Sequence, residues 1–177
     1  MTRPSPGNGR TQLAEHRNVS VKIEYLSDRP EFLPTLAQWH FQEWSMLRPG
    51  DSVDARVIRL QGWCGRGGIP LTVIALSDNE LLGSASLIEH DMDDRLELTP
   101  WLAGVFVAPE HRRKGIGAAL VSRVMAEATS LGLPKLYLYT MDSTAFYASL
   151  GWSLMEKTRY RQMAVSIMSF TPSLSAS

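Results

Sequence analysis

The chain has almost no cysteine and no net charge. Only one of its 177 residues, Cys64, is a cysteine, so the chain forms no internal disulfide and offers no cysteine pair to a metal. Eighteen lysines and arginines balance eighteen aspartates and glutamates, which argues against a protein that binds nucleic acid by neutralising its phosphates. No apolar run is long enough to cross a membrane, and the N-terminal residues lack the apolar core of a signal peptide. We therefore expect a cytoplasmic protein that binds neither nucleic acid nor a membrane and holds no metal.

The length of 177 residues corresponds to about one domain. Prolines and glycines among polar neighbours predict a disordered N-terminal extension over residues 1–17. The periodic apolar patterns of a single folded domain then occupy residues 18–170, and residues 171–177 form a polar tail.

Apolar spacing within this domain predicts alternating strands and helices. The predicted strands lie over 19–26, 71–76, 81–88, 101–107, 135–139, 153–160 and 162–170. The predicted helices lie over 30–47, 52–63, 116–131 and 143–150. Gly83, inside the second strand of the hairpin, indicates a bulge or a close approach of another backbone. This order of elements predicts an α+β fold with a mixed sheet.

Residues 105–120 have the order expected of a phosphate-binding site. An apolar strand is followed by a turn at Pro109 and by a basic, glycine-containing loop that opens into a helix. The first N–H groups of a helix have no partner within it, and its dipole is positive there, so such a junction attracts phosphate. Two nucleotide-binding patterns are excluded: no Lys-Ser/Thr pair follows the glycines, and Leu120 stands where a Rossmann fingerprint needs its third glycine.

Two motifs in this order carry a resemblance to a known family. The first is Arg112-x-x-Gly115-x-Gly117 after the turn Val107-Ala108-Pro109, and the second is the segment 145–152, which contains Tyr147 and follows the strand 136–140. Together they resemble the GNAT family of N-acetyltransferases, whose signatures are Gln/Arg-x-x-Gly-x-Gly/Ala and Ala-x-x-x-Tyr-x-x-x-Gly-Phe. Here the second signature is compressed, and Trp152 replaces its Phe. The order of elements agrees along roughly 19–170.

The resemblance implies a GNAT-like mixed, mostly antiparallel central sheet flanked by helices, with acetyl-CoA as cofactor. The backbone amides of residues 113–118 are expected to hold the pyrophosphate, and the main chain at Val105 and Val107 the pantetheine arm. Asp142 stands where the family often has Asn, and it either contacts the cofactor or caps the next helix. The cofactor-binding residues implied are Val105, Phe106, Val107, Arg112, Arg113, Lys114, Gly115, Ile116, Gly117, Ala118 and Asp142.

The resemblance also implies part of the chemistry. Tyr147 matches the family tyrosine beside the sulfur, a general acid for the leaving thiolate, although it is also placed to be a core aromatic of a short helix. The backbone N–H near Val105 is the expected oxyanion donor. The strand 102–107 lacks the glutamate that family members often carry there, which leaves the base open among Glu97, the pair Glu89 and His90, and water.

Other side chains are open to two interpretations. His40 shares an apolar helical face, which favours a core histidine over a catalytic one. The acidic loop 89–97 is either a solvated loop or a wall of the acceptor site that attracts a cationic amine. Trp39, Trp44 and Trp63 pack in the core or form an aromatic wall at that site.

We expect an N-acetyltransferase that moves an acetyl group to a primary amine by direct attack in a ternary complex, without using Cys64. A small-molecule acceptor is the main expectation. The alternatives are a protein N-terminus or lysine as acceptor, or a non-catalytic acyl-CoA sensor. The sequence leaves both a monomer and a homodimer open.

Overall fold

A computed structural model describes residues 20–173. The helices are α1 (Leu33–Trp44), α2 (Val53–Gly62), α3 (Ile116–Ser130) and α4 (Thr144–Ser149). The strands are β1 (Lys22–Tyr25), β2 (Leu71–Ser77), β3 (Glu80–Ile88), β4 (Trp101–Val107), β5 (Leu136–Thr140), β6 (Ser153–Tyr160) and β7 (Met163–Phe170). The predicted N-terminal extension 1–17 and most of the predicted polar tail lie outside the described residues. Within 20–173, no helix is long and apolar enough to span a bilayer.

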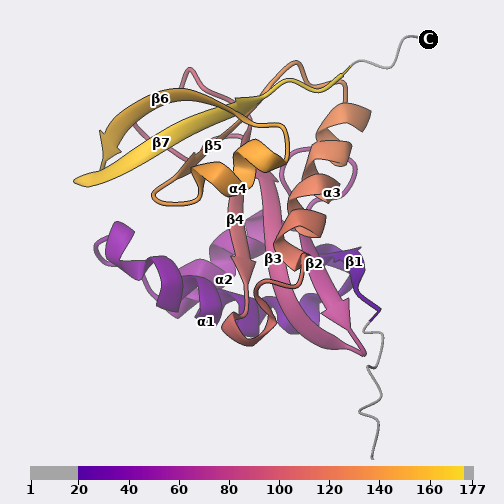
Figure 1. The fold of residues 1–177 in the computed structure, drawn as a ribbon. Helices are drawn as coiled ribbons and strands as arrows, with labels where there is room; N and C mark the ends of the chain where they lie inside the picture. Colours follow the sequence, from indigo (N-terminus) through magenta and orange to yellow (C-terminus); the bar gives the residue numbers. More distant parts are fainter. Residues whose placement is uncertain (1–19, 174–177) are drawn as a thin grey trace, which may run out of the picture.

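The seven strands form one sheet in the order β1-β2-β3-β4-β5-β7-β6 (Figure 1). The pair β4–β5 is parallel, and each of the other neighbouring pairs is antiparallel. This confirms the expected α+β fold with a mixed, mostly antiparallel sheet. Helix α3 supplies the crossover that a parallel pair requires, because it connects the end of β4 to the start of β5.

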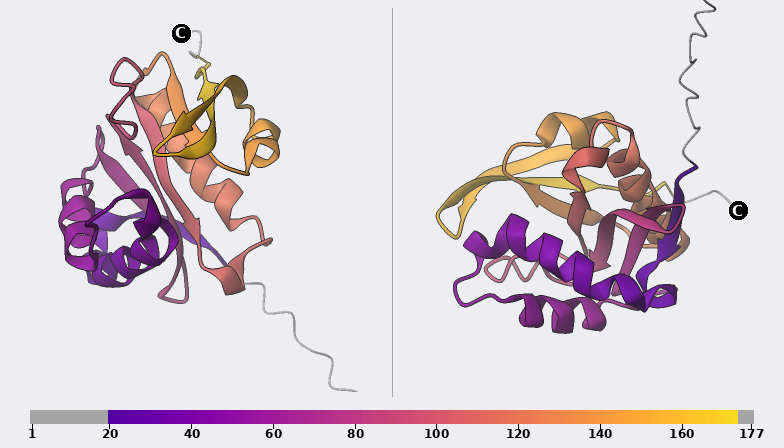
Figure 2. Two further views of the ribbon diagram at one scale, coloured as in Figure 1. Left: turned by 90° about the vertical axis from the view of Figure 1, so that its left-hand side faces the viewer. Right: turned by 90° about the horizontal axis from the view of Figure 1, so that it is seen from below.

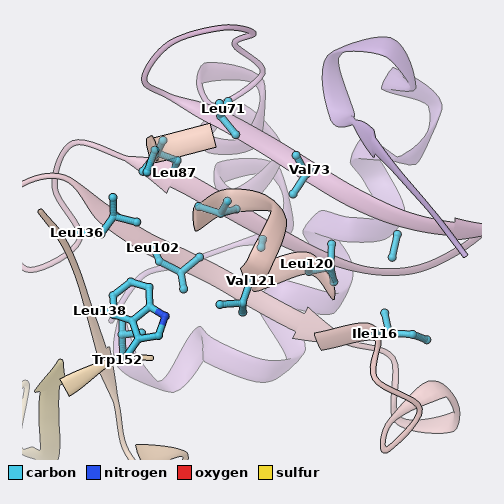
Figure 3. Close-up of a cluster of buried hydrophobic side chains, with 14 of the residues drawn as sticks. Leu71, Val73, Leu87, Leu102, Ile116, Leu120, Val121, Leu136, Leu138 and Trp152 are labelled. Atoms are coloured by element: carbon cyan, nitrogen blue, oxygen red, sulfur yellow. The ribbon is translucent and has the colours of Figure 1, made fainter. Parts of the chain in front are cut away.

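Helices cover both faces of the sheet, with α1 and α2 on one face and α3 on the other (Figure 2). Strand β2 shows how the sequence produces this, since alternate side chains of a strand point to opposite faces. Ile74 and Leu76 pack with the cluster of α1 and α2. Val73 and Ala75 pack with the cluster of α3. Figure 3 shows this second cluster, with Leu120 and Val121 of α3 above the strands.

Some element boundaries differ from the predicted ones. Strand β1 is shorter than the predicted 19–26, since residues Leu26–Asp28 form a 3₁₀ turn. The predicted helix 30–47 is α1 extended by one 3₁₀ turn at each end. The close approach predicted at Gly83 is confirmed, because a Cβ atom there would lie 2.3 Å from the carbonyl oxygen of Phe106.

Candidate functional site

Strand β4 is bulged where the site lies. Phe106 pairs with Ser84 and Ala103 pairs with Ser86, so Gly104 and Val105 together lie opposite one residue of β3. Gly104 has a φ of 59°, a conformation that glycine adopts without steric cost. Beyond the bulge β4 also leaves its parallel neighbour: β4 and β5 are paired at Trp101 and diverge toward their C-terminal ends (Figure 1). A gap opens between the two strands at Val105.

A buried histidine lies beneath the bulge. His40 is 2% exposed, its Nε2 atom lies 2.9 Å from Ser84 Oγ, and the Ser84 hydroxyl donates to the carbonyl oxygen of Gly104 over 2.8 Å. Burial, followed by the charges of Arg56 and Arg59, lowers the pKa of His40 to about 3. The prediction of a core histidine with a hydrogen-bond partner is therefore confirmed, and this histidine shapes the strand that borders the site.

Two cavities meet in the gap. The first, which we call the loop cavity, has a volume of about 490 Å³ and lies between the end of β4, the loop before α3, and α4. Of the residues implied to bind the cofactor, those that line it are Val105, Phe106, Val107, Arg112, Arg113, Gly115, Ile116, Gly117, Ala118 and Asp142. Ten residues that are scattered over 38 positions of the sequence therefore share one cavity.

The basic residues of the loop are arranged differently from one another. Arg112 turns back toward its own strand, where its Nε donates to the Val107 carbonyl oxygen over 2.8 Å and its guanidinium lies 5.5 Å from the Phe106 ring centroid. Arg113 has a φ of 61° and lines the loop cavity. Lys114 is exposed and is not one of the lining residues. The structure thus brings together every implied cofactor-binding residue except Lys114.

The second cavity, which we call the gap cavity, has a volume of about 260 Å³ and lies between the splayed parts of β4 and β5. Leu102, Ala103, Gly104 and Val105 of β4 line it along one side. The residues shared with the loop cavity are Glu43, Val105, Asp142, Ser143 and Tyr147. These five define the junction of the two cavities.

Tyr147 stands at this junction on α4. It is half-buried, and burial together with the charge of Asp142 raises the pKa of its phenol to about 12. Its ring packs against Phe146 and Trp152, with centroids 5.0 and 6.3 Å away. Its aromatic contacts are therefore those of a core residue, and it also lines both cavities.

Asp142 does not cap α4, which corrects one of its two predicted roles. The N-cap residue of α4 is Ser143, and no side chain caps the helix by a hydrogen bond. The Asp142 carboxylate instead accepts from the Ser143 hydroxyl over 3.0 Å. This leaves Asp142 at the junction, where its charge faces both cavities.

The three residues proposed from the sequence as bases lie elsewhere. Glu97 is exposed and pairs with Arg95 over 2.7 Å, and Glu89 and His90 are exposed residues after the end of β3. None of them is among the residues lining either cavity. The carboxylates that do line the gap cavity belong to Glu43, Asp91 and Asp142.

Glu43 and Asp91 were not identified by sequence reasoning as separate site residues. Glu43 extends from the last turn of α1, so the junction depends on where a helix packs, and sequence spacing does not show that. Asp91 belongs to the predicted acidic loop, but of that loop's acidic residues it is the one that lines the cavity. Burial raises the pKa of Asp91 to about 6, although Arg48 and three further arginines act in the opposite direction.

The three tryptophans divide between the two interpretations. Trp44 lines the gap cavity and packs edge-on against His40, with ring centroids 4.9 Å apart. Trp39 and Trp63 pack in the core beside α1 and α2. Of the three tryptophans, Trp44 is thus the one that lines the gap cavity.

Comparison with known proteins gives the family. The model of the Acetyltransferase (GNAT) family matches residues 29–152, which is more than half of the chain. No curated protein matches it.

Solved structures share the fold. A candidate acetyltransferase from Exiguobacterium sp. 255-15 is 29% identical with a TM-score of 0.59, over 84% of this chain and 92% of that one. An acetyltransferase of the GNAT family from Streptococcus pneumoniae is 13% identical with a TM-score of 0.65, over 87% and 100%. Spermidine N-acetyltransferase from Vibrio cholerae, solved with CoA and spermine, is 19% identical with a TM-score of 0.62, over 85% and 95%.

The family match covers both sequence motifs, β4 with its bulge, and the helices that border the gap. The chain therefore belongs to the GNAT family of acetyl-CoA-dependent N-acetyltransferases.

Proposed function

We propose that the protein transfers the acetyl group of acetyl-CoA to a primary amine of a small molecule, by direct attack in a ternary complex. The observation that carries this proposal is the junction: Val105 and Tyr147 line both the loop cavity and the gap cavity. A donor in one cavity and an acceptor in the other meet there without passing through an enzyme nucleophile.

The loop cavity fits the CoA part of the donor. Backbone N–H groups at the start of α3 and the guanidinium of Arg113 suit the pyrophosphate. Gly117 leaves room close to the backbone, since a Cβ atom there would lie 3.6 Å from Phe146 and 3.7 Å from Val107. Val105 and Val107 lie on the edge of β4 that faces the gap, where the extended pantetheine arm can hydrogen-bond like an added strand.

The junction residues fit the transfer step. Acetyl-CoA supplies the acetyl group as a thioester. The Val105 N–H lies where β4 has diverged from β5, and we place it as the donor to the oxyanion. The Tyr147 phenol is protonated at neutral pH and is placed to donate to the sulfur as the thiolate leaves. We assign the removal of the amine's proton to Glu43, the α1 carboxylate at the junction.

The gap cavity favours a compact acceptor. Arg161, in the turn between β6 and β7, donates to the Leu47 carbonyl oxygen over 2.7 Å and pairs with Asp93 over 2.6 Å. One guanidinium therefore links three separate segments at the half-enclosed cavity, and its volume of about 260 Å³ suits a small molecule.

Steady-state kinetics tests this proposal. CoA release is measured with a thiol reagent across a panel of primary amines, while acetyl-CoA and amine are both varied. A ternary complex gives intersecting double-reciprocal lines, and Cys64→Ser keeps the wild-type rate, because Cys64 lies among the α1–α2 core and its thiol donates to the Leu60 carbonyl oxygen. Parallel double-reciprocal lines, or loss of activity in Cys64→Ser, would show a covalent acetyl-enzyme. Tight CoA binding without transfer to any amine would instead favour an acyl-CoA sensor.

A further inference from the structure

Charge is distributed unevenly along the gap cavity. At the junction its charged lining residues are both acidic, Glu43 and Asp142. Away from the junction they are mainly basic: Arg48, Arg56 and Arg161, together with Asp91. An acceptor in this cavity therefore meets negative charge where transfer takes place and positive charge at the other end.

The strands show how far apart the two ends lie. Along β4, Leu102 to Gly104 line only the gap cavity, Val105 lines both, and Phe106 lines only the loop cavity. Asp91 follows β3, whose last residue, Ile88, pairs with the first residue of β4. The basic end thus lies beyond Leu102, and the three residue-to-residue steps from Leu102 to Val105 span about 10 Å.

The basic end carries one more positive charge than negative. Arg56 pairs with Asp51 over 2.6 Å, and Arg161 pairs with Asp93 over 2.6 Å. A fourth guanidinium, that of Arg59, lies 3.8 Å from Asp51. With Arg48 there are four arginines against three carboxylates, those of Asp51, Asp91 and Asp93.

Two guanidinium groups at this end have N–H groups without a hydrogen-bond partner among the described residues. Within residues 20–173, the Arg48 side chain makes no ion pair and no hydrogen bond, although it lines the cavity and is close enough to lower the pKa of Asp91. The Nη1 atom of Arg59 is buried without a hydrogen-bond partner. An arginine fork without a partner in a half-enclosed site suits a planar carboxylate.

We propose that the acceptor is an amine that also carries a carboxylate, held with its amine between Glu43 and Asp142 and its carboxylate at Arg48. This rests on the proposed function and names the acceptor class of the same site. The separation of about 10 Å between the two ends favours an amine several bonds away from the carboxylate over an α-amino acid. The single excess positive charge suits a carboxylate better than a doubly charged phosphate.

Three amines of equal chain length test the charge pattern. 6-Aminohexanoate, hexylamine and 1,6-diaminohexane place a negative, a neutral and a positive group at the end away from the reacting nitrogen. Wild-type kcat/KM is expected to fall about tenfold from the first to the second and again to the third. Arg48→Gln should reduce the ratio of 6-aminohexanoate to hexylamine toward one, and Arg48→Lys should restore part of it. Lys22→Gln, at an exposed lysine of the edge strand β1, makes the same charge change away from the site.

Binding separates a failure of this inference from a failure of the proposed function. Thermal stabilisation of the CoA complex by each amine is measured as well, because it does not depend on turnover. If no amine is acetylated but 6-aminohexanoate stabilises the complex most and requires Arg48, the charge pattern stands and transfer is refuted. If kcat/KM for 1,6-diaminohexane equals that for 6-aminohexanoate, or if Arg48→Gln lowers kcat/KM equally for all three amines, the carboxylate inference is overturned while transfer stands.

Discussion

His40 donates a hydrogen bond to Ser84. The Ser84 hydroxyl has one proton and gives it to the carbonyl oxygen of Gly104, so the 2.9 Å contact with His40 must be a donation from Nε2. This assigns the imidazole as a neutral tautomer protonated at Nε2, in agreement with its lowered pKa. Through Ser84, a helix on one face of the sheet is thus connected by hydrogen bonds to Gly104 in the bulge of β4, next to Val105.

Acid should weaken the fold through His40. The unfolded chain binds a proton at this histidine below about pH 6.5, whereas the native imidazole, with a pKa of about 3, stays neutral. The stability contributed by the neutral imidazole is therefore complete above pH 6.5 and is lost as the pH falls toward 3, by up to about 1.4 kcal/mol per pH unit. Urea unfolding of wild type and His40→Gln between pH 7 and 4.5 measures the difference in slope.

A matched substitution isolates this effect. His90→Gln removes an exposed histidine after the end of β3, and its unfolding free energy should follow the wild-type pH dependence. Parallel pH dependences for wild type and His40→Gln would contradict the assignment of His40 as a buried neutral imidazole.

Gly83→Ala should destabilise the protein and disturb the site. The new Cβ would lie 2.3 Å from the Phe106 carbonyl oxygen and 3.1 Å from Val107 Cα, so the backbones of β3 and β4 must move apart. We expect a loss of about 1–3 kcal/mol of unfolding free energy and weaker CoA binding. Gly62→Ala in α2 is the control, since nothing lies within 4 Å of its Cβ position and alanine favours a helix. Equal stability of the two variants would refute the close approach.

Two substitutions at Gly117 should separate folding from cofactor binding. Gly117→Ala adds a Cβ at ordinary contact distances of 3.6 and 3.7 Å, so stability and CoA affinity should stay near wild type. Gly117→Glu fills the loop cavity and adds negative charge where we place the pyrophosphate, so CoA affinity should fall about a hundredfold or more. Calorimetric titration with CoA measures both, and equal affinities would remove the loop cavity as the cofactor site.

Tyr147→Phe should lower kcat by about a hundredfold or more, the effect typical of a lost general acid. The affinity for CoA should change little, because the ring and its contacts with Phe146 and Trp152 remain. Tyr137→Phe is the control: its ring packs on Trp101, and it is not among the residues lining either cavity. Similar kcat values for Tyr147→Phe and wild type would show that the phenol is not the acid.

Much of the fold could be predicted from local patterns. The alternation along β2 and the three- and four-residue spacing in α1 and α3 are periodic signals that depend on neighbouring residues alone. The ends of these elements were less predictable, as at β1, because a 3₁₀ turn at Leu26 continues the chain without a change in apolar content. The bulge at Gly104 escaped prediction, since it depends on the pairing of β4 with β3 and on the histidine beneath it.

The candidate site likewise has one part that could be predicted from the sequence and one part that could not. The loop before α3 is contiguous in sequence, so its glycines and basic residues were readable, and the structure gathers all of the implied cofactor residues but Lys114 in one cavity. The gap cavity is built from residues of α1, α2, the loop after β3, β4, β5, α4 and the β6–β7 turn. Arg161 lies more than a hundred positions after Glu43 and Arg48 in the sequence. No spacing rule connects residues that far apart.

The sequence by itself determined the family and the cofactor, because a phosphate-binding loop is local: one strand end, one turn and one helix start hold its donors together. Only the tertiary structure decided which charged side chains line the gap cavity, where we propose that the acceptor binds. Those residues meet through the packing of α1 on the sheet and the splaying of β4 from β5, and long-range contacts of this kind leave no periodic trace along the chain.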